Sequence, residues 1–138
     1  MLSAPLFEDR KQAGKKLASK LEKFKDRKVI VLSIPRGGTV IGYEVAKKLQ
    51  APLDVVVPRK LRAPNQPELA IGAITEDGNI ILNQQLVNSL NVSSDYLEKE
   101  SERQKLEIDR RLQTYKGDEG FPDLKGFHVI VVDDGIAT

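Results

Sequence analysis

Residues 129–132 are four consecutive β-branched amino acids, Val-Ile-Val-Val, and this run constrains the fold more than any other stretch of the chain. A short apolar run without polar alternation predicts a strand buried on both faces, which is typical of an inner strand of a parallel sheet. Asp133 and Asp134 follow at its C-terminal end, and residues 135–138 continue as a short turn. In open α/β sheets ligands bind at that edge, and such a turn can direct backbone N–H groups toward a phosphate.

Two earlier apolar runs, residues 29–32 and 53–57, predict further strands of the same sheet, with a helix between them over residues 39–49. A β–helix–β order gives a right-handed crossover, so these strands lie parallel and their C-terminal ends meet at one edge. Three basic residues follow the strand ends: Arg36, Arg59 and Lys60. We therefore expect a basic edge that faces the carboxylates of the last strand.

The turn Pro35-Arg36-Gly37-Gly38 is the first candidate for anion binding. Paired glycines let backbone amides converge on an anion beside a guanidinium. The same turn also fits an ordinary strand-to-helix connection with an exposed arginine, and the residues alone leave both interpretations open. Lys60 likewise fits either an anion contact or an ordinary charged loop residue. Thr39 is the expected N-cap of the following helix.

Residues 61–83 are predicted to form a flexible insertion. Two prolines make residues 61–68 unsuited to a helix or a central strand, so we expect a mobile loop there. Asp-Gly at 77–78 between two apolar segments predicts a β-hairpin over residues 70–82. A hairpin that projects from a parallel sheet can close over a site as a lid, or it can be only a decorated crossover.

Two further helices are expected on the surface of the sheet. Amphipathic spacing predicts a packed helix over residues 8–26. Ser93 and its neighbours can cap a long polar helix that runs to about residue 114, with a sparse apolar stripe of Tyr96, Leu106 and Leu112. Its alternating charges predict exposed ion pairs between successive turns rather than acid–base chemistry.

The composition limits the chemistry that these elements can support. With no cysteine and one histidine, the 138 residues exclude a thiolate zinc site and a His-rich cluster, so a metal would be Mg²⁺ held by oxygen atoms. A net charge of +2 does not favour nucleic-acid binding, and the apolar runs are too short to span a membrane. Charged residues 8–10 stand where a signal peptide needs an apolar core, so we expect a cytoplasmic protein.

The residues at the predicted sheet edge resemble those of the type I phosphoribosyltransferases. Residues 129–138 are similar to the first ten positions of that family's phosphoribosyl pyrophosphate (PRPP) signature, which normally continues with Gly, any residue, and Thr or Ser. Residues 35–38, residues 68–73 and Arg110-Arg111 with Tyr115 are similar to the group known only as predicted phosphoribosyltransferases. The resemblance covers nearly the whole chain but not the C-terminal part of a family domain.

The resemblance implies an α/β fold in three layers, with a mainly parallel, Rossmann-like sheet and an inserted hairpin lid. Residues 1–138 would form a single domain that is truncated at its C-terminus. The 5′-phosphate and ribose of PRPP would contact the residues of the last turn: Asp133, Asp134, Gly135, Ile136, Ala137 and Thr138. Pyrophosphate would contact the basic edge: Arg36, Gly37, Gly38, Arg59 and Lys60, of which either Arg59 or Lys60 approaches it near the lid.

The implied reaction transfers the 5-phosphoribosyl group of PRPP to a nitrogenous base, a purine or a pyrimidine, and releases pyrophosphate. Asp133, Asp134 and Lys60 would be the catalytic residues, and PRPP would hold Mg²⁺, with the two aspartates as further ligands. Ala137 stands where hypoxanthine–guanine enzymes carry an aspartate base, which argues against 6-oxopurines. Alanine at that place is also found in adenine and uracil enzymes, so it does not select the acceptor.

Other functions remain open at this stage. The chain could be a PRPP- or nucleotide-binding regulatory module without catalysis, or an inactive truncated fragment of a phosphoribosyltransferase. A phosphorylation receiver also gathers aspartates at strand ends, but its acidic pair should follow an early strand. A sheet that ends at residues 129–132 would expose an apolar edge, so we expect a homo-oligomer such as a dimer.

Overall fold

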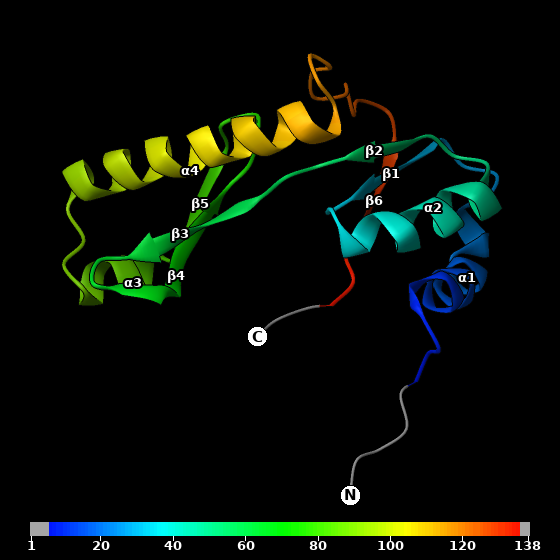
Figure 1. Cartoon of the computed structure of the whole chain (residues 1–138), viewed down its shortest axis with the longest axis horizontal. Coiled ribbons are helices and arrows are strands. Elements are labelled where there is room, and N and C mark those ends of the chain that lie inside the picture. The colour runs from blue at the N-terminus through cyan, green and yellow to red at the C-terminus, as the bar shows by residue number, and fades with distance from the viewer. Residues whose placement is uncertain (1–5, 136–138) are drawn as a thin grey trace, which may run out of the picture. The chain divides into compact units, whose positions relative to one another are not determined.

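The computed structural model describes residues 6–135, which divide into two compact units (Figure 1). The first unit contains the chain up to Val56 and again from Pro122, and the second contains Val57–Phe121. Each unit is built on a three-stranded sheet of its own. The second unit includes the predicted insertion at residues 61–83 and extends beyond it at both ends. That the whole chain forms a single domain stays a prediction.

The first unit contains the predicted parallel sheet. Its strands, in spatial order, are β2 (Leu53–Val55), β1 (Val29–Ser33) and β6 (His128–Val132). Ser33 pairs with Val55 on one side and with Val132 on the other, so the three C-terminal ends are level at one edge. This confirms the predicted crossover between residues 29 and 57 and the predicted convergence of strand ends.

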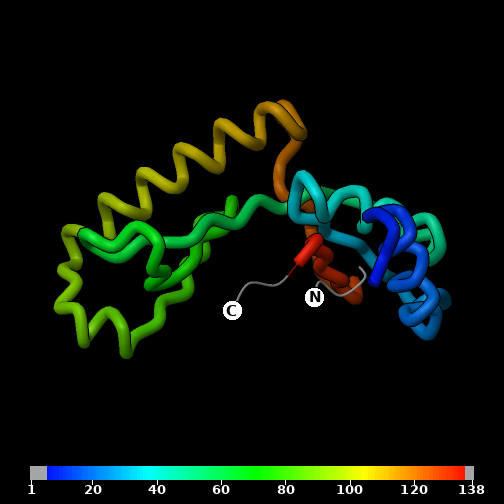
Figure 2. Tube along the Cα trace, turned by 60° about the horizontal axis from the view of Figure 1, so that its bottom comes forward, coloured from blue at the N-terminus to red at the C-terminus, as the bar shows by residue number. Residues whose placement is uncertain are grey.

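Two helices cover one face of this sheet. They are α1 (Arg10–Lys20), followed by the short 3₁₀ helix η1 (Glu22–Phe24), and α2 (Gly37–Leu49). The helices α1 and α2 pack side by side in both views (Figures 1 and 2), and Ala18, Val31, Val45 and Val132 form the core between them and the sheet. A Cβ atom at Gly42 would lie 2.9 Å from Ser33 Cβ, so this glycine lets α2 lie close to β1.

The start of α2 corrects the predicted N-cap. The helix begins at Gly37 with Arg36 as its N-cap, so Thr39 lies in the first turn. The Thr39 hydroxyl instead lies 3.2 Å from Ser33 Oγ at the buried end of β1. The glycines allow the helix to start two residues earlier because no side chain obstructs their approach to β6.

The final strand is not buried on both faces among the described residues. β6 pairs with β1 and has no second neighbour in this part of the chain, and Val129 and Val131 are 40% and 60% exposed. Four β-branched residues set strand propensity, but only the neighbouring elements decide which face is covered. The other face of the sheet packs against Leu124 and Phe127, and the expected third layer stays a prediction.

The second unit contains an antiparallel sheet of β3 (Arg59–Ala63), β4 (Gln66–Ile74) and β5 (Ile80–Leu82). The pairing of β4 with β5 confirms the predicted hairpin around Asp77-Gly78. The expected mobile loop at 61–68 is wrong, because these residues form the end of β3, a turn, and the start of β4. Pro67 is tolerated because it lies on β4 opposite the register shift between Arg62 and Ala63 of β3. The hydrogen-bond ladder between the two strands therefore requires no N–H from it.

The helices of the second unit are α3 (Gln84–Ser89) and α4 (Ser94–Tyr115), and α4 runs along β3 and β4 (Figure 2). Ser93 Oγ accepts a hydrogen bond from the Tyr96 N–H, which confirms the predicted cap. The predicted apolar stripe is wrong at Leu106, which is 71% exposed, whereas Tyr96 and Leu112 are half-buried. The fully buried positions of α4 are Glu100, Gln104 and Ile108. None of the described helices is long and apolar enough to cross a membrane.

Candidate functional site

Two predicted segments that are distant in sequence meet at the C-terminal edge of the parallel sheet. A Cβ atom at Gly37 would overlap the Asp134 carboxylate, and one at Gly38 would lie 2.8 Å from the Val132 carbonyl and 3.0 Å from Asp133 Cα. The start of α2 therefore lies directly against the turn that follows β6. At position 38 only glycine permits this approach, because a side chain would displace the backbone of that turn, whereas a side chain at position 37 would displace the Asp134 and Arg10 side chains.

The start of α2 offers unpaired backbone N–H groups at this edge. The helix spans 13 residues, and Arg36 makes no side-chain capping hydrogen bond to its first turn. The first N–H groups of a helix have no partner within the helix and carry a partial positive charge. The amides of Gly37 and Gly38 are therefore suited to hold an anion close to the two aspartates.

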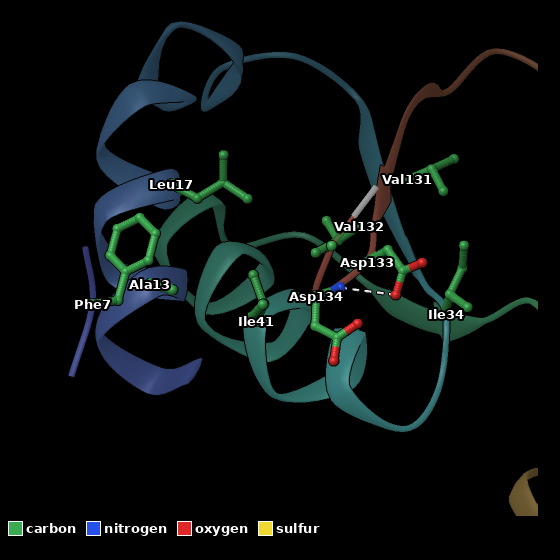
Figure 3. Close-up of a pocket in the computed structure, with 10 residues that line it drawn as sticks. Phe7, Ala13, Leu17, Ile34, Ile41, Val131, Val132, Asp133 and Asp134 are labelled. Atoms are coloured by element: carbon green, nitrogen blue, oxygen red, sulfur yellow. Dashed lines mark hydrogen bonds between the residues drawn. The ribbon is translucent and has the colours of Figure 1, made fainter. Parts of the chain in front are cut away.

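Asp133 and Asp134 are exposed and are held by two contacts. The Asp134 backbone N–H donates to Asp133 Oδ1 at 2.8 Å, as the dashed line in Figure 3 shows. Arg10, the first residue of α1, donates from Nη2 and Nε to Asp134 Oδ2 at 2.8 and 3.3 Å. The hydrogen bond from Arg10 holds the pKa of Asp134 below its ordinary value of 3.8.

A cavity of about 670 Å³ adjoins the two aspartates within the first unit (Figure 3). Its apolar wall consists of Phe7, Ala13, Leu17, Ile34, Ile41, Val131 and Val132, and Asp133, Asp134 and Gly135 complete the lining. A mostly apolar hollow with a few polar groups is typical of small-molecule sites. The carboxylates could accept hydrogen bonds from hydroxyl groups of a ligand placed there.

The remaining predicted site residues belong to the second unit or fall outside the described part of the chain. Arg59 and Lys60 belong to β3 of the second unit, where Arg59 Nε donates to Gln104 Oε1 at 3.0 Å and Lys60 Nζ donates to the Glu68 carbonyl at 3.4 Å. Their approach to the ligand of the first unit stays a prediction. Three residues of the predicted phosphate turn lie outside the described part of the chain: Ile136, Ala137 and Thr138.

Sequence reasoning missed Arg10. This residue stands 124 positions before Asp134 and belongs to a helix with many charged residues. No local pattern distinguishes it from the neighbouring lysines, because its contact with Asp134 arises only when α1 packs beside α2.

Replacing Arg10 by methionine is expected to raise the pKa of Asp134 toward 3.8, because the hydrogen bond that lowers it is lost. A carboxylate with a lowered pKa stabilises the fold at pH values above its ordinary pKa, and this stabilisation is lost as pH falls through the lowered value. Titration of the Asp134 carboxyl carbon by NMR measures the shift. Lys11→Met is the matched control, and an unchanged Asp134 midpoint in the Arg10 variant would contradict the contact.

A family model and two relatives name the same family, and a solved structure shares the fold. A sequence model described as "Phosphoribosyl transferase domain" matches residues 7–138. Two Mycobacterium tuberculosis proteins, "Putative phosphoribosyl transferase MT0597" of strain CDC 1551 and "Putative phosphoribosyl transferase Rv0571c" of strain H37Rv, are each 44% identical over 133 residues. The match covers 96% of this chain but only 30% of either relative. The crystal structure of TT1426 from Thermus thermophilus matches with a TM-score of 0.80 and 38% identity, over 93% of this chain and 61% of that chain.

Proposed function

The chain belongs to the phosphoribosyl transferase domain family, and we propose that it transfers the 5-phosphoribosyl group of PRPP to a nitrogenous base and releases pyrophosphate. The observation that carries this proposal is the direct contact of Gly37 and Gly38 with the Asp133-Asp134 turn at the carboxyl edge of the parallel sheet. PRPP has a hydroxyl-bearing ribose between two phosphate-rich ends. A pair of carboxylates beside a helix N-terminus offers partners for the ribose and for one of these ends.

In the proposed complex, the ribose hydroxyls donate hydrogen bonds to Asp133 and Asp134. The pyrophosphate accepts hydrogen bonds from the Gly37 and Gly38 amides and from the Arg36 guanidinium. Residues 135–138 bind the 5′-phosphate, and Arg59 or Lys60 approaches the pyrophosphate. Arg10 must release Asp134 when ribose binds, and its exposed ion pair is of a kind that contributes little to stability.

The proposed reaction breaks the bond between ribose C1 and the pyrophosphate oxygen, and the bonding electron pair leaves with pyrophosphate. A nitrogen of the base then bonds to C1 through its lone pair, and the proton that this nitrogen carried is released to solvent. Positive charge develops on the ribose ring, and carboxylates that hold its hydroxyls stabilise that charge. The chain contributes mainly by positioning the two reactants and by electrostatic stabilisation, with the β4–β5 hairpin as the proposed lid.

The donor groups of the site fit Mg²⁺ bound through PRPP. The two carboxylates are exposed, and the described residues contain no group of three or more His, Cys, Asp or Glu that could hold a metal. Magnesium is commonly held by one or two carboxylates together with phosphate oxygens of the substrate. Asp133 and Asp134 would be its protein ligands, and when bound it would neutralise charge on the departing pyrophosphate.

Incubation of the chain with isotope-labelled PRPP, Mg²⁺ and a panel of purine and pyrimidine bases tests this function. We expect pyrophosphate release with at least one base. PRPP binding and turnover should be measured separately, because the chain spans only 30% of the length of its curated relatives. Binding without release for any base would instead favour a regulatory module, and no binding at all would contradict the assignment of the site.

A further inference from the structure

We propose that the second unit carries a separate binding site for a nucleotide with two or more phosphate groups. The site is formed by four arginines, here called the arginine cluster: Arg59, Arg62, Arg103 and Arg110. They line one cavity of about 400 Å³ together with Gln104, Leu106 and Glu107. The arginine cluster belongs to the second unit, whereas Gly37, Gly38 and the two aspartates belong to the first, and Arg59 is a candidate contact for both ligands. The inference does not depend on the proposed PRPP site.

The fold brings the arginine cluster together from two elements. Arg59 and Arg62 stand three apart on β3, and in a regular strand such residues face opposite sides. The ladder between β3 and β4 shifts register between Leu61 and Arg62, and irregularities of this kind re-aim a side chain. α4 packs along β3 and contributes Arg103 and Arg110, which are seven residues apart and therefore on one face of the helix, about 10 Å apart along its axis.

Neighbouring side chains hold the arginines of β3 and the nearer arginine of α4. Glu100 is fully buried beneath them, with Oε2 3.5 Å from Arg62 Nε and Oε1 in an ion pair with Arg103 Nη2. Glu100 Oε2 also accepts from the Arg62 backbone N–H at 2.5 Å, and Gln104 Oε1 accepts from Arg59 Nε at 3.0 Å. A guanidinium has five N–H donors, so these contacts orient the arginines and leave donors for a ligand.

Arg110 is held by Glu107, which also binds Arg111. The Glu107 carboxylate accepts from Arg110 at 2.6 and 3.1 Å and from Arg111 Nε at 3.0 Å. Hydrogen bonds from these two arginines lower the pKa of Glu107 to about 2, so this carboxylate is charged at neutral pH.

The carboxylates do not neutralise this region. Five arginines, the arginine cluster and Arg111, stand against two carboxylates, Glu100 and Glu107, which leaves an excess of three positive charges. Positive charges that line one cavity repel one another, and a bound polyanion would relieve that repulsion. Arg103 and Arg110 stand about 10 Å apart along α4 and Arg59 and Arg62 lie on the neighbouring strand, so the cavity offers enough guanidinium groups to bind more than one phosphate group.

Leu106 indicates that the ligand is more than an inorganic anion. It lies on α4 between Arg103 and Arg110, lines the same cavity, and is 71% exposed. A nucleobase has a flat apolar face that can lie against a leucine, and guanidinium groups stack on such rings. Phosphates on the arginines and a base on Leu106 describe a nucleoside diphosphate or triphosphate.

Calorimetric titration with ADP and GDP tests the proposal. The arginine variants are made in a chain whose proposed PRPP site has been removed by mutation. In the Asp133→Asn, Asp134→Asn chain, we expect both nucleotides to bind, and Arg110→Gln to weaken that binding about tenfold because a charge-assisted hydrogen bond is lost. Arg111→Gln is the matched control: it shares Glu107 but does not line the cavity, so its effect should stay within about twofold. Circular dichroism checks that both variants are folded.

The possible outcomes separate this site from the PRPP site. Loss of ADP and GDP binding in the Asp133→Asn, Asp134→Asn chain would overturn the proposal, because the nucleotides would then occupy the first unit, and it would leave the proposed transfer reaction intact. Equal weakening by Arg110→Gln and Arg111→Gln would also overturn it, since only general electrostatics would be involved. If inorganic pyrophosphate binds as tightly as ADP, the proposed contact between the nucleobase and Leu106 is wrong.

Discussion

Replacing Asp133 and Asp134 together by asparagine is expected to lower the affinity for Mg²⁺·PRPP at least about a hundredfold, because two charged acceptors for the ribose hydroxyls become neutral. The fold should be unaffected. The amide oxygen at position 133 can still accept the hydrogen bond from the next backbone N–H, and the Arg10–Asp134 ion pair is exposed. Calorimetric titration with PRPP and Mg²⁺ measures the affinity, and thermal unfolding checks the fold.

Asp26→Asn is the matched control, since it removes an exposed carboxylate of the same unit outside the site. It should bind PRPP as the unchanged chain does. Unchanged PRPP binding by the Asp133→Asn, Asp134→Asn chain would show that the assignment of these aspartates is wrong. A reduced unfolding temperature would mean that the turn after β6 supports the fold as well as the site.

Gly38→Ala is expected to destabilise the first unit by about 1–3 kcal/mol, which is the usual effect of forcing a methyl group into a closely packed place. Its Cβ would lie 2.8 Å from the Val132 carbonyl and 3.0 Å from Asp133 Cα, and both are backbone atoms that cannot move without shifting β6. Gly37→Ala should behave differently. Its Cβ would meet the ends of the Asp134 and Arg10 side chains, which can rotate away.

We therefore expect Gly37→Ala to keep the unfolding temperature and to weaken PRPP binding, because Asp134 is displaced from its position. Gly38→Ala should reduce both. Urea unfolding and calorimetric titration measure the two effects, and Gly120→Ala is the control, since nothing lies within 4 Å of the added methyl group. Equal stability of the Gly38 and Gly120 variants would contradict the close contact between α2 and the turn after β6.

Much of the first unit could be predicted from local sequence. The three strands at residues 29–33, 53–55 and 128–132 correspond to the apolar runs at 29–32, 53–57 and 129–132, and the parallel order follows from the helix between the first two. The contact between Gly37-Gly38 and Asp133-Asp134 was expected only in general terms, as convergence at one sheet edge. The distances that make Gly38 necessary, and that place Gly37 against the Asp134 side chain, come from the packed structure.

The second unit shows where local patterns fail. Pro64 and Pro67 predicted a mobile loop at 61–68, but an irregular ladder accommodates both prolines in a β-hairpin. The helix α4 was expected to bury Leu106, yet it buries Glu100, because Arg62 of β3 adds an ion pair that no pattern along α4 contains to the one from Arg103, three residues along the same helix. A buried carboxylate is stable only when positively charged or hydrogen-bonding groups surround it. A partner on β3 cannot be inferred from the spacing of residues along α4.

The sequence by itself determined the strands and helices of the first unit, the family resemblance, and the residue types at the sheet edge, because these depend on periodicity and on neighbours along the chain. Only the tertiary structure decided that Arg10 holds Asp134, that Gly37 and Gly38 touch the turn after β6, and that four arginines share one cavity. Each of these contacts joins residues that are far apart along the chain or on different elements. Their meeting is set by packing between elements, which no local pattern encodes.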